Sequence, residues 1–227
     1  MATGSFIHLK GVLNQEELQQ VRDSLRNSKF EDGKLTASGA AVKVKYNEQL
    51  VNSPQNLQIE QYLLRAMLNH ELVKFGVMPK MYMPPLVSRY TEGMHYGTHV
   101  DSPLNGREYT IRTDVGMTLF LNEPEDYEGG ELEVMTGGEY KAYKLAAGDA
   151  ICYPTTQLHR VNPVKSGERL VAVTWMQCIV RDAHKRELIY QTYEVIQAME
   201  KNGKANTEEH LKLQQVYSNL IRLWAEL

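Results

Sequence analysis

The sequence predicts an α+β protein with a mainly β core, supported by N-terminal helices and followed by a C-terminal helical pair. Two observations predict this class. Helical periods occupy the first 80 residues and return after residue 181, while short β-rich runs separated by turn residues fill the segment between them. A chain of 227 residues is also long enough to bury a full core without disulfides or a structural metal. We therefore expect a helical support in residues 1–80, a β core in residues 81–181 and a helical extension in residues 182–227.

Two amphipathic helices are expected before the β region. Asn14 precedes an acidic first turn with apolar residues at helical spacing, so residues 15–25 form the first helix. Ser53 and Pro54 are a cap and a first-turn proline for a second helix, which we expect to end near Gly76. Between these helices, GKLTASGAAVKVKYN is rich in glycine and then alternates, which indicates a loop leading into a short strand.

From Met81 onward the sequence consists of short runs typical of strands. A succession of such runs, each bounded by turn residues, is typical of a sandwich, a jelly roll or a barrel. The runs are MYMPPLVSRY, RTDVGMTLFLN, GGELEVM, YKAYKLAAG, DAICYP, HRVNPV and RLVAVTWMQCIV. The two cysteines, Cys152 and Cys178, lie in apolar runs and are expected to be buried reduced thiols.

Helical periods return after Arg181. The stretch DAHKRELIYQTYEVIQAME predicts one helix, and Thr207 caps a second helix whose apolar residues lie on one face. We expect this pair to pack on the β domain. The alternative is a dimerisation or partner surface, which would make the protein a homodimer through its C-terminal helices.

Charge and hydropathy exclude several classes of partner. The formal net charge is −3 with both signs mixed along the chain, so no basic stripe is present for nucleic acid. The start MATGSFIHLKGVL has no features of a signal peptide, and no run of about 18 apolar residues follows. We expect no membrane or nucleic-acid partner and a cytoplasmic location.

A possible metal site begins in the stretch YTEGMHYGTHVDSP. His99 and Asp101 are two residues apart, and in a strand this spacing sends both side chains to one face. The spacing alone is weak, because His-x-Asp also occurs by chance. A later segment adds His159 and, after a turn, Arg169, which an antiparallel hairpin would bring back toward His159.

These residue types suit one chemistry in particular. Two histidines and one carboxylate leave three positions of an octahedral metal open, which is the arrangement of non-haem Fe(II) oxygenases. An arginine on a neighbouring strand offers a two-pronged donor for a carboxylate in the barrel.

The order of motifs resembles the Fe(II)/2-oxoglutarate-dependent dioxygenase superfamily. Within it, the chain is most similar to the bacterial PKHD-type hydroxylases, relatives of the prolyl 4-hydroxylase catalytic domain. The motifs, which lie between about Met81 and Arg181, are Tyr90, Gly93, Tyr96, His99, Asp101, Phe120 to Asn122, Gly129 to Leu132, His159, Arg169 and Trp175.

The resemblance implies a double-stranded β-helix (jelly roll) core. It implies iron held by His99, Asp101 and His159, and 2-oxoglutarate held by Arg169. The implied reaction uses O2 to hydroxylate a substrate while 2-oxoglutarate becomes succinate and CO2, with L-ascorbate as the reductant that rescues oxidised iron.

Other residues are weaker candidates. Tyr90 and Thr118 are candidate contacts of the cosubstrate, Tyr96 is an alternative, and Trp175 is a candidate pocket wall; each has a plain packing role as its alternative. His95 stands four residues before His99, but nearby glycines argue against the helix that a zinc motif of this spacing requires.

The substrate is open at this point between a peptidyl proline and a small molecule, because the motifs describe the reacting centre and not a recognition surface. Two other functions remain as alternatives. One is a zinc-dependent hydrolase on the same barrel, and the other is a noncatalytic sensor of metal or 2-oxoglutarate.

Overall fold

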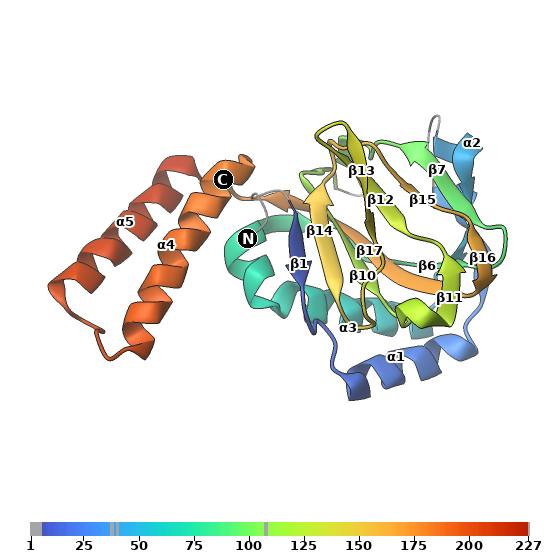
Figure 1. The fold of residues 1–227 in the computed structure, drawn as a ribbon, viewed down its shortest axis with the longest axis horizontal. Helices are drawn as coiled ribbons and strands as arrows, with labels where there is room; N and C mark the ends of the chain where they lie inside the picture. The colour runs from blue at the N-terminus through green and yellow to red at the C-terminus, as the bar shows by residue number, and fades with distance from the viewer. Residues whose placement is uncertain (1–5, 37–38, 40, 107–108, 227) are drawn as a thin grey trace.

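The computed structural model describes residues 6–36, 39, 41–106 and 109–226 (Figure 1). Its main elements are two antiparallel sheets with a buried apolar cluster between them, and helices that cover the outer face of the larger sheet. The mixed α/β architecture with mostly antiparallel strands confirms the expected class at this level.

The larger sheet has eight strands. Their order is β1-β14-β10-β17-β6-β4-β2, and β5 also pairs with β17. The strands are β1 (Ile7–Leu9), β2 (Phe30–Asp32), β4 (Glu48–Leu50), β5 (Pro79–Tyr82), β6 (Leu86–Tyr90), β10 (Val115–Phe120), β14 (Ala150–Pro154) and β17 (Arg169–Cys178).

The smaller sheet has five strands in the order β13-β12-β15-β7-β3. They are β3 (Lys45–Tyr46), β7 (His95–His99), β12 (Leu132–Thr136), β13 (Glu139–Tyr143) and β15 (His159–Val161). Two short ladders complete the β structure. They pair β11 (Tyr127–Gly129) with β16 (Val164–Gly167), and β8 (Leu104–Asn105) with β9 (Ile111–Arg112).

The larger sheet is buried on both faces. Helices α1 (Gln15–Arg26) and α3 (Pro54–Asn69) pack on one face, where Leu119 of β10 belongs to the same cluster as their apolar residues. The next residue, Phe120, belongs to the cluster between the two sheets. Side chains alternate between the two faces of a strand. A central strand with an apolar cluster on each face is therefore buried at every position, as β10 is.

The helix beginnings follow the sequence predictions. The Asn14 side chain accepts a hydrogen bond from the Glu17 N–H at 2.9 Å, and the Glu17 carboxylate accepts one from the Asn14 N–H at 2.8 Å. Ser53 caps α3 by accepting from the Asn56 N–H. These side chains satisfy N–H groups that have no partner inside a helix.

The predicted end of the second helix was wrong. Helix α3 ends at Asn69 because His70 takes an extended backbone with ψ of 133°, and not near Gly76. The His70 Nδ1 then accepts a hydrogen bond from the Leu72 N–H, and the π-helical turn η2 (Val73–Val77) follows. The apolar stripe continues through this turn, which explains why periodicity alone extended the helix.

The first 80 residues contribute strands as well as helices. Of the short strand expected in residues 33–47, only β3 forms, and it pairs with β7. The preceding residues Ala41–Val44 form the short helix α2, and residues 37, 38 and 40 of the expected loop lie outside the described residues. Strands β1, β2 and β4 were not expected, because each has three residues and is too short to show an alternating pattern. The division of the chain into three domains stays a prediction.

The C-terminal helices α4 (Ala183–Lys201) and α5 (Glu208–Trp224) extend away from the sheets (Figure 1). Helix α4 contacts η2, where the rings of Phe75 and Tyr193 stack at 4.2 Å. Helix α5 packs mainly along α4, and Val216 and Leu223 on its apolar face are 48% and 73% exposed. The pair therefore meets the rest of the protein mainly through α4 and through Glu226, which follows α5. A homodimer through this face stays a prediction.

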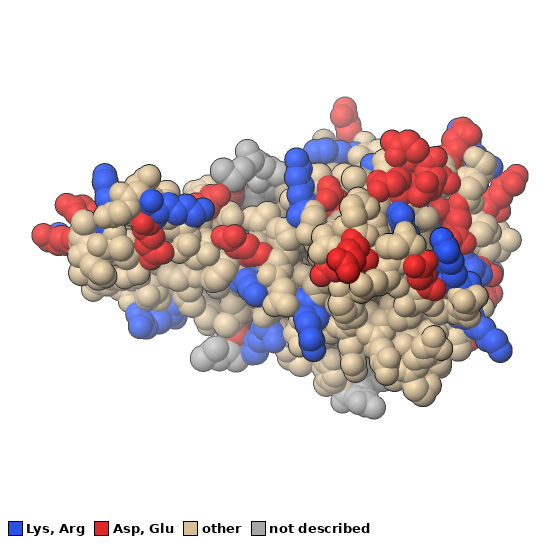
Figure 2. Space-filling view, turned by 90° about the horizontal axis from the view of Figure 1, so that it is seen from below, with Lys and Arg blue, Asp and Glu red and all other residues tan. Residues whose placement is uncertain are grey.

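The distribution of charged side chains and the state of the two cysteines agree with what the sequence predicts. Figure 2 shows Lys, Arg, Asp and Glu side chains interspersed over one face of the molecule. Cys152 and Cys178 are buried free thiols, as predicted. No helix in the described part of the chain is long and apolar enough to span a bilayer.

Close packing of α2 (Ala41–Val44) on β7 generates a first prediction. A Cβ at Gly97 would lie 2.8 Å from the Val44 Cβ, so we expect Gly97→Ala to destabilise the protein by about 1–3 kcal/mol through overpacking. Urea unfolding measures this change. In a Val44→Gly background, which lacks the contacting Cβ, Gly97→Ala should cost less than it does in the wild type, and an equal cost in both backgrounds would contradict the contact.

Candidate metal centre

Three separated residues meet at the end of β7. His99 is the last residue of β7, Asp101 follows it, and His159 is the first residue of β15. The two strands are antiparallel neighbours, and their register places His159 opposite His99. One ligand atom from each of the three side chains lies within 4.8 Å of the other two, a separation that suits a shared metal ion.

The three side chains converge at short distances. His159 Nε2 lies 3.7 Å from Asp101 Oδ1, and the rings of His99 and His159 have centroids 4.2 Å apart. Asp101 Oδ2 is buried and has no hydrogen-bond partner among the described residues. A buried carboxylate oxygen without a partner is costly, so this atom is suited to a ligand.

Backbone carbonyls fix the orientation of both imidazoles. His99 Nδ1 lies 2.8 Å from the Gly97 oxygen, and His159 Nδ1 lies 3.0 Å from the Gln157 oxygen. A carbonyl oxygen only accepts, so each Nδ1 carries the hydrogen and donates it. Each Nε2 is then left with a free lone pair, as a metal-bound histidine requires.

Burial disfavours charge on these ligands. Burial, with the neighbouring His159, lowers the pKa of His99 to about 3, so its imidazole is neutral at physiological pH. Burial also raises the pKa of Asp101, while His159 and the Trp175 indole N–H oppose that change. A bound cation would provide the counter-charge that the Asp101 carboxylate otherwise lacks.

Arg169 lies on the larger sheet, directly across from Tyr90 in the β17–β6 pairing. Its side chain is 1% exposed, and its Nε and Nη1 atoms have no hydrogen-bond partner among the described residues. The guanidinium carbon lies 4.9 Å from the Tyr90 ring centroid and 5.7 Å from that of Phe120. A cation buried among aromatic rings without a carboxylate is a site for an anion.

The weaker candidates occupy different places. Thr118 is buried on β10 near Tyr153, and it opposes the rise in the pKa of Tyr153 that burial causes. Tyr96 stacks on the His99 ring at 3.7 Å, so it supports a ligand. Among the described residues, the cluster that could hold a metal ion does not include His95.

Sequence reasoning missed Tyr153. Its ring centroid lies 5.3 Å from that of His159, and the side chain is 2% exposed. A Cβ at Gly116 on the neighbouring strand would lie 3.1 Å from this ring, so the glycine leaves room for it. In the sequence, the only indication was that Tyr153 lies two residues after Ile151 in the run DAICYP, so that both side chains would lie on one face of a strand.

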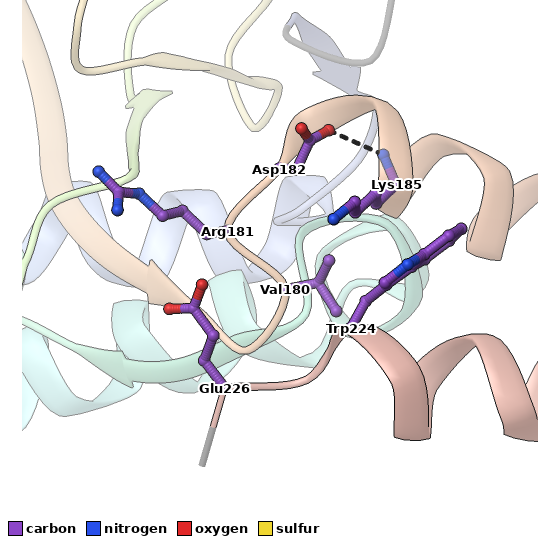
Figure 3. A pocket seen from close by; sticks show the side chains of 6 residues that line it. All are labelled: Val180, Arg181, Asp182, Lys185, Trp224 and Glu226. Atoms are coloured by element: carbon purple, nitrogen blue, oxygen red, sulfur yellow. Dashed lines mark hydrogen bonds between the residues drawn. The ribbon is translucent and has the colours of Figure 1, made fainter.

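A separate pocket lies where β17 leads into α4, beside the end of α5 (Figure 3). Its volume is about 330 Å³, and its walls include Arg181 and Trp224. Lys185 Nζ lies 5.5 Å from the Trp224 ring centroid. None of the three metal-ligand candidates lines this pocket, so it is distinct from the candidate centre.

Comparison with known proteins identifies the family. Residues 85–177 match the model of the 2OG-Fe(II) oxygenase superfamily, and residues 183–226 match that of the PKHD-type hydroxylase C-terminal domain. A PKHD-type hydroxylase of Picosynechococcus is 43% identical, and one of Hyphomonas neptunium is 38% identical. Each comparison covers 97% of this chain and 100% of the relative.

A solved structure shares the fold. It is a prolyl hydroxylase from Trichoplax adhaerens, in complex with a peptide fragment of the hypoxia inducible factor oxygen degradation domain. The TM-score is 0.56 at 19% identity, and the match covers 82% of this chain and 87% of that one. With full-length relatives at this level of identity, the chain belongs to the PKHD-type hydroxylases of the 2OG-Fe(II) oxygenase superfamily.

Proposed function

We propose that this protein is an Fe(II)- and 2-oxoglutarate-dependent hydroxylase whose iron is held by His99, Asp101 and His159. The proposal rests on two sets of polar side chains in the interior between the sheets, each of which lacks a partner. A cluster of two imidazoles and one carboxylate lies on the smaller sheet, and Arg169 is buried without an anionic partner on the larger sheet. We also propose that these facing sheets are the double-stranded β-helix of the family.

The donor set fits ferrous iron. Two neutral imidazole nitrogens and one carboxylate oxygen bind a divalent first-row metal and leave positions open for other ligands. Ferrous iron with 2-oxoglutarate and O2 supplies the hydroxylating chemistry, in which 2-oxoglutarate becomes succinate and CO2. The protein contributes the orientation of the ligands, through the carbonyls of Gly97 and Gln157, and an interior shielded by apolar side chains.

Arg169 is the residue proposed to hold the distal carboxylate of 2-oxoglutarate. Its Nε and Nη1 atoms have no hydrogen-bond partner among the described residues, and each can donate a hydrogen bond to an anion. The dianion would also offset the positive charges of Arg169 and of a bound divalent metal. We propose the Tyr90 hydroxyl as a further donor to this carboxylate, because Tyr90 is the cross-strand neighbour of Arg169. Thr118 has its hydroxyl near Tyr153 and is proposed to act at the same site.

For the substrate, a peptidyl proline and a small molecule both stay predictions. The prolyl hydroxylase that shares the fold was solved with a peptide, which supports the first class. Ascorbate as a reductant and the cytoplasmic location also stay predictions.

The first experiment is an anaerobic titration of metal-free protein with Fe(II) and then 2-oxoglutarate. We expect a weak visible charge-transfer band when the keto acid chelates iron, followed by slow succinate formation when oxygen is admitted. Retention of zinc, with no band and no succinate, would favour the zinc-dependent hydrolase. Iron and 2-oxoglutarate binding without any turnover across candidate substrates would favour the sensor.

Removing the carboxylate ligand should separate metal binding from folding. We expect Asp101→Ala to lose Fe(II) binding and succinate formation, because only two imidazoles remain. The fold should persist, because the apolar clusters do not depend on the metal. Fe(II) titration and circular dichroism check the two parts, and wholesale unfolding of the variant would contradict this prediction.

Replacing the buried arginine should have opposite effects on binding and stability. We expect Arg169→Met to weaken 2-oxoglutarate binding about 100-fold or more, with Fe(II) affinity nearly unchanged, because a buried charge pair is lost. The free energy of unfolding of the metal-free protein should stay the same or rise, since an unpaired buried cation is removed. Equal losses of iron and 2-oxoglutarate affinity would instead mean that Arg169 is structural.

A further inference from the structure

The segment that joins β3 to β4 carries polar side chains into the interior. Lys45, Asn47 and Gln49 alternate along it, and they are only 5%, 2% and 5% exposed. The segment also links the two sheets, because β3 pairs with β7 in the smaller sheet and β4 pairs with β6 in the larger one. Three polar residues therefore line the interior where the two sheets come together.

Two of these residues have hydrogen-bond partners. Lys45 Nζ donates to Thr36 Oγ1 at 3.0 Å, and the Thr36 hydroxyl donates to Gln49 Oε1. Neither the Nδ2 nor the Oδ1 atom of Asn47 has a hydrogen-bond partner among the described residues. Leaving both atoms of a buried amide unpaired costs stability, so a packing role alone does not account for asparagine at this position.

Asn47 lies beside the proposed cosubstrate contacts. Strand β4 pairs Gln49 with Ser88 and Glu48 with Arg89, so Asn47 is next in line with Tyr90. Tyr90 is in turn opposite Arg169. Burial raises the pKa of the Tyr90 phenol, while Arg169 and an interaction with the Asn47 side chain oppose this rise. Asn47 therefore lies near enough to the phenol for its amide N–H to act on the phenol oxygen.

Gly33 fixes the Asn47 side chain in place. A Cβ at Gly33 would lie 2.0 Å from Asn47 Oδ1, and the Gly33 N–H donates to the Asn47 backbone oxygen at 2.9 Å. Gly33 is not among the described residues with positive φ, so its backbone does not need a glycine. Space for the Asn47 amide is the physical reason for a glycine here.

We propose that Asn47 is a positioning residue of the cosubstrate site, which directs the Tyr90 hydroxyl toward the carboxylate held by Arg169. When the Asn47 amide donates to the phenol oxygen, the hydroxyl hydrogen of Tyr90 is free to donate to a carboxylate oxygen. Donation into the phenol also strengthens the hydrogen bond that the phenol gives. This inference rests on the proposed 2-oxoglutarate function.

The test compares Asn47→Ala and Asn47→Asp with the wild type in the anaerobic Fe(II) titration, where the charge-transfer band measures 2-oxoglutarate affinity. We expect Asn47→Ala to bind about tenfold more weakly, as expected for one lost hydrogen bond. Asn47→Asp should bind more weakly still, because a carboxylate accepts the Tyr90 hydrogen and repels the cosubstrate. Fe(II) affinity should change by less than about twofold in both variants.

Two controls separate positioning from general damage. Gln49→Ala removes a neighbouring buried amide of the same segment, and we expect it to reduce stability but not 2-oxoglutarate affinity. In a Tyr90→Phe background, adding Asn47→Ala should cause no further loss, because Asn47 acts through Tyr90. Gly33→Ala should reproduce the weaker binding without removing any polar group, and thermal melts confirm that each variant is folded.

The outcomes are distinct. Unchanged 2-oxoglutarate affinity in Asn47→Ala, or additive losses with Tyr90→Phe, would overturn the role of Asn47 while leaving the proposed function intact. Equal losses in Asn47→Ala and Gln49→Ala would also overturn it. A wild-type protein that binds Fe(II) without any 2-oxoglutarate band would overturn the proposed function, and this inference with it.

Discussion

The antiparallel register between β7 and β15 is the constraint on which the candidate centre depends. It places His159 opposite His99 and brings Asp101 to the same point, although these residues are 60 positions apart in the chain. Since side chains alternate along a strand, a slip of one residue would turn an imidazole out of the interior. An irregularity in the pairing lies between His159 and Val161, and bulges are frequent where a strand must direct a side chain into a site.

The interior between the sheets holds charges that weaken the fold unless ligands bind. Arg169 and the Oδ2 atom of Asp101 are buried, and both residues have polar atoms without partners among the described residues. The fold offsets this cost with two apolar clusters, one on each face of the larger sheet. Because His99, His159 and Arg169 lie on strands of these sheets, their side chains are held in place before any ligand arrives.

The N-terminal segment is built into this interior. Strands β3 and β4 extend the two sheets on the side where Tyr90 and Tyr96 lie, and β3 places Lys45 next to Tyr96. The proposed role of Asn47 would make these strands part of the site as well as of the scaffold. By contrast, the pair α4 and α5 meets the rest of the protein mainly through η2 and the chain end, which leaves the apolar face of α5 open.

The sequence by itself determined the features that depend on near neighbours. The caps Asn14, Ser53 and Thr207 were predictable because a side chain there bonds an N–H two or three residues away. The spacing of His99 and Asp101 also predicted that the two side chains converge, although β7 ends at His99 and Asp101 lies just beyond the strand.

Only the tertiary structure decided what depends on distant segments meeting. The three-residue strands of the larger sheet and the exposure of α5 follow from packing between elements far apart in the chain. Tyr153 near His159, and Asn47 beside Tyr90, likewise have no local signature. The burial of a residue and its hydrogen-bond partners are decided where two segments meet, so a pattern within one segment cannot predict them.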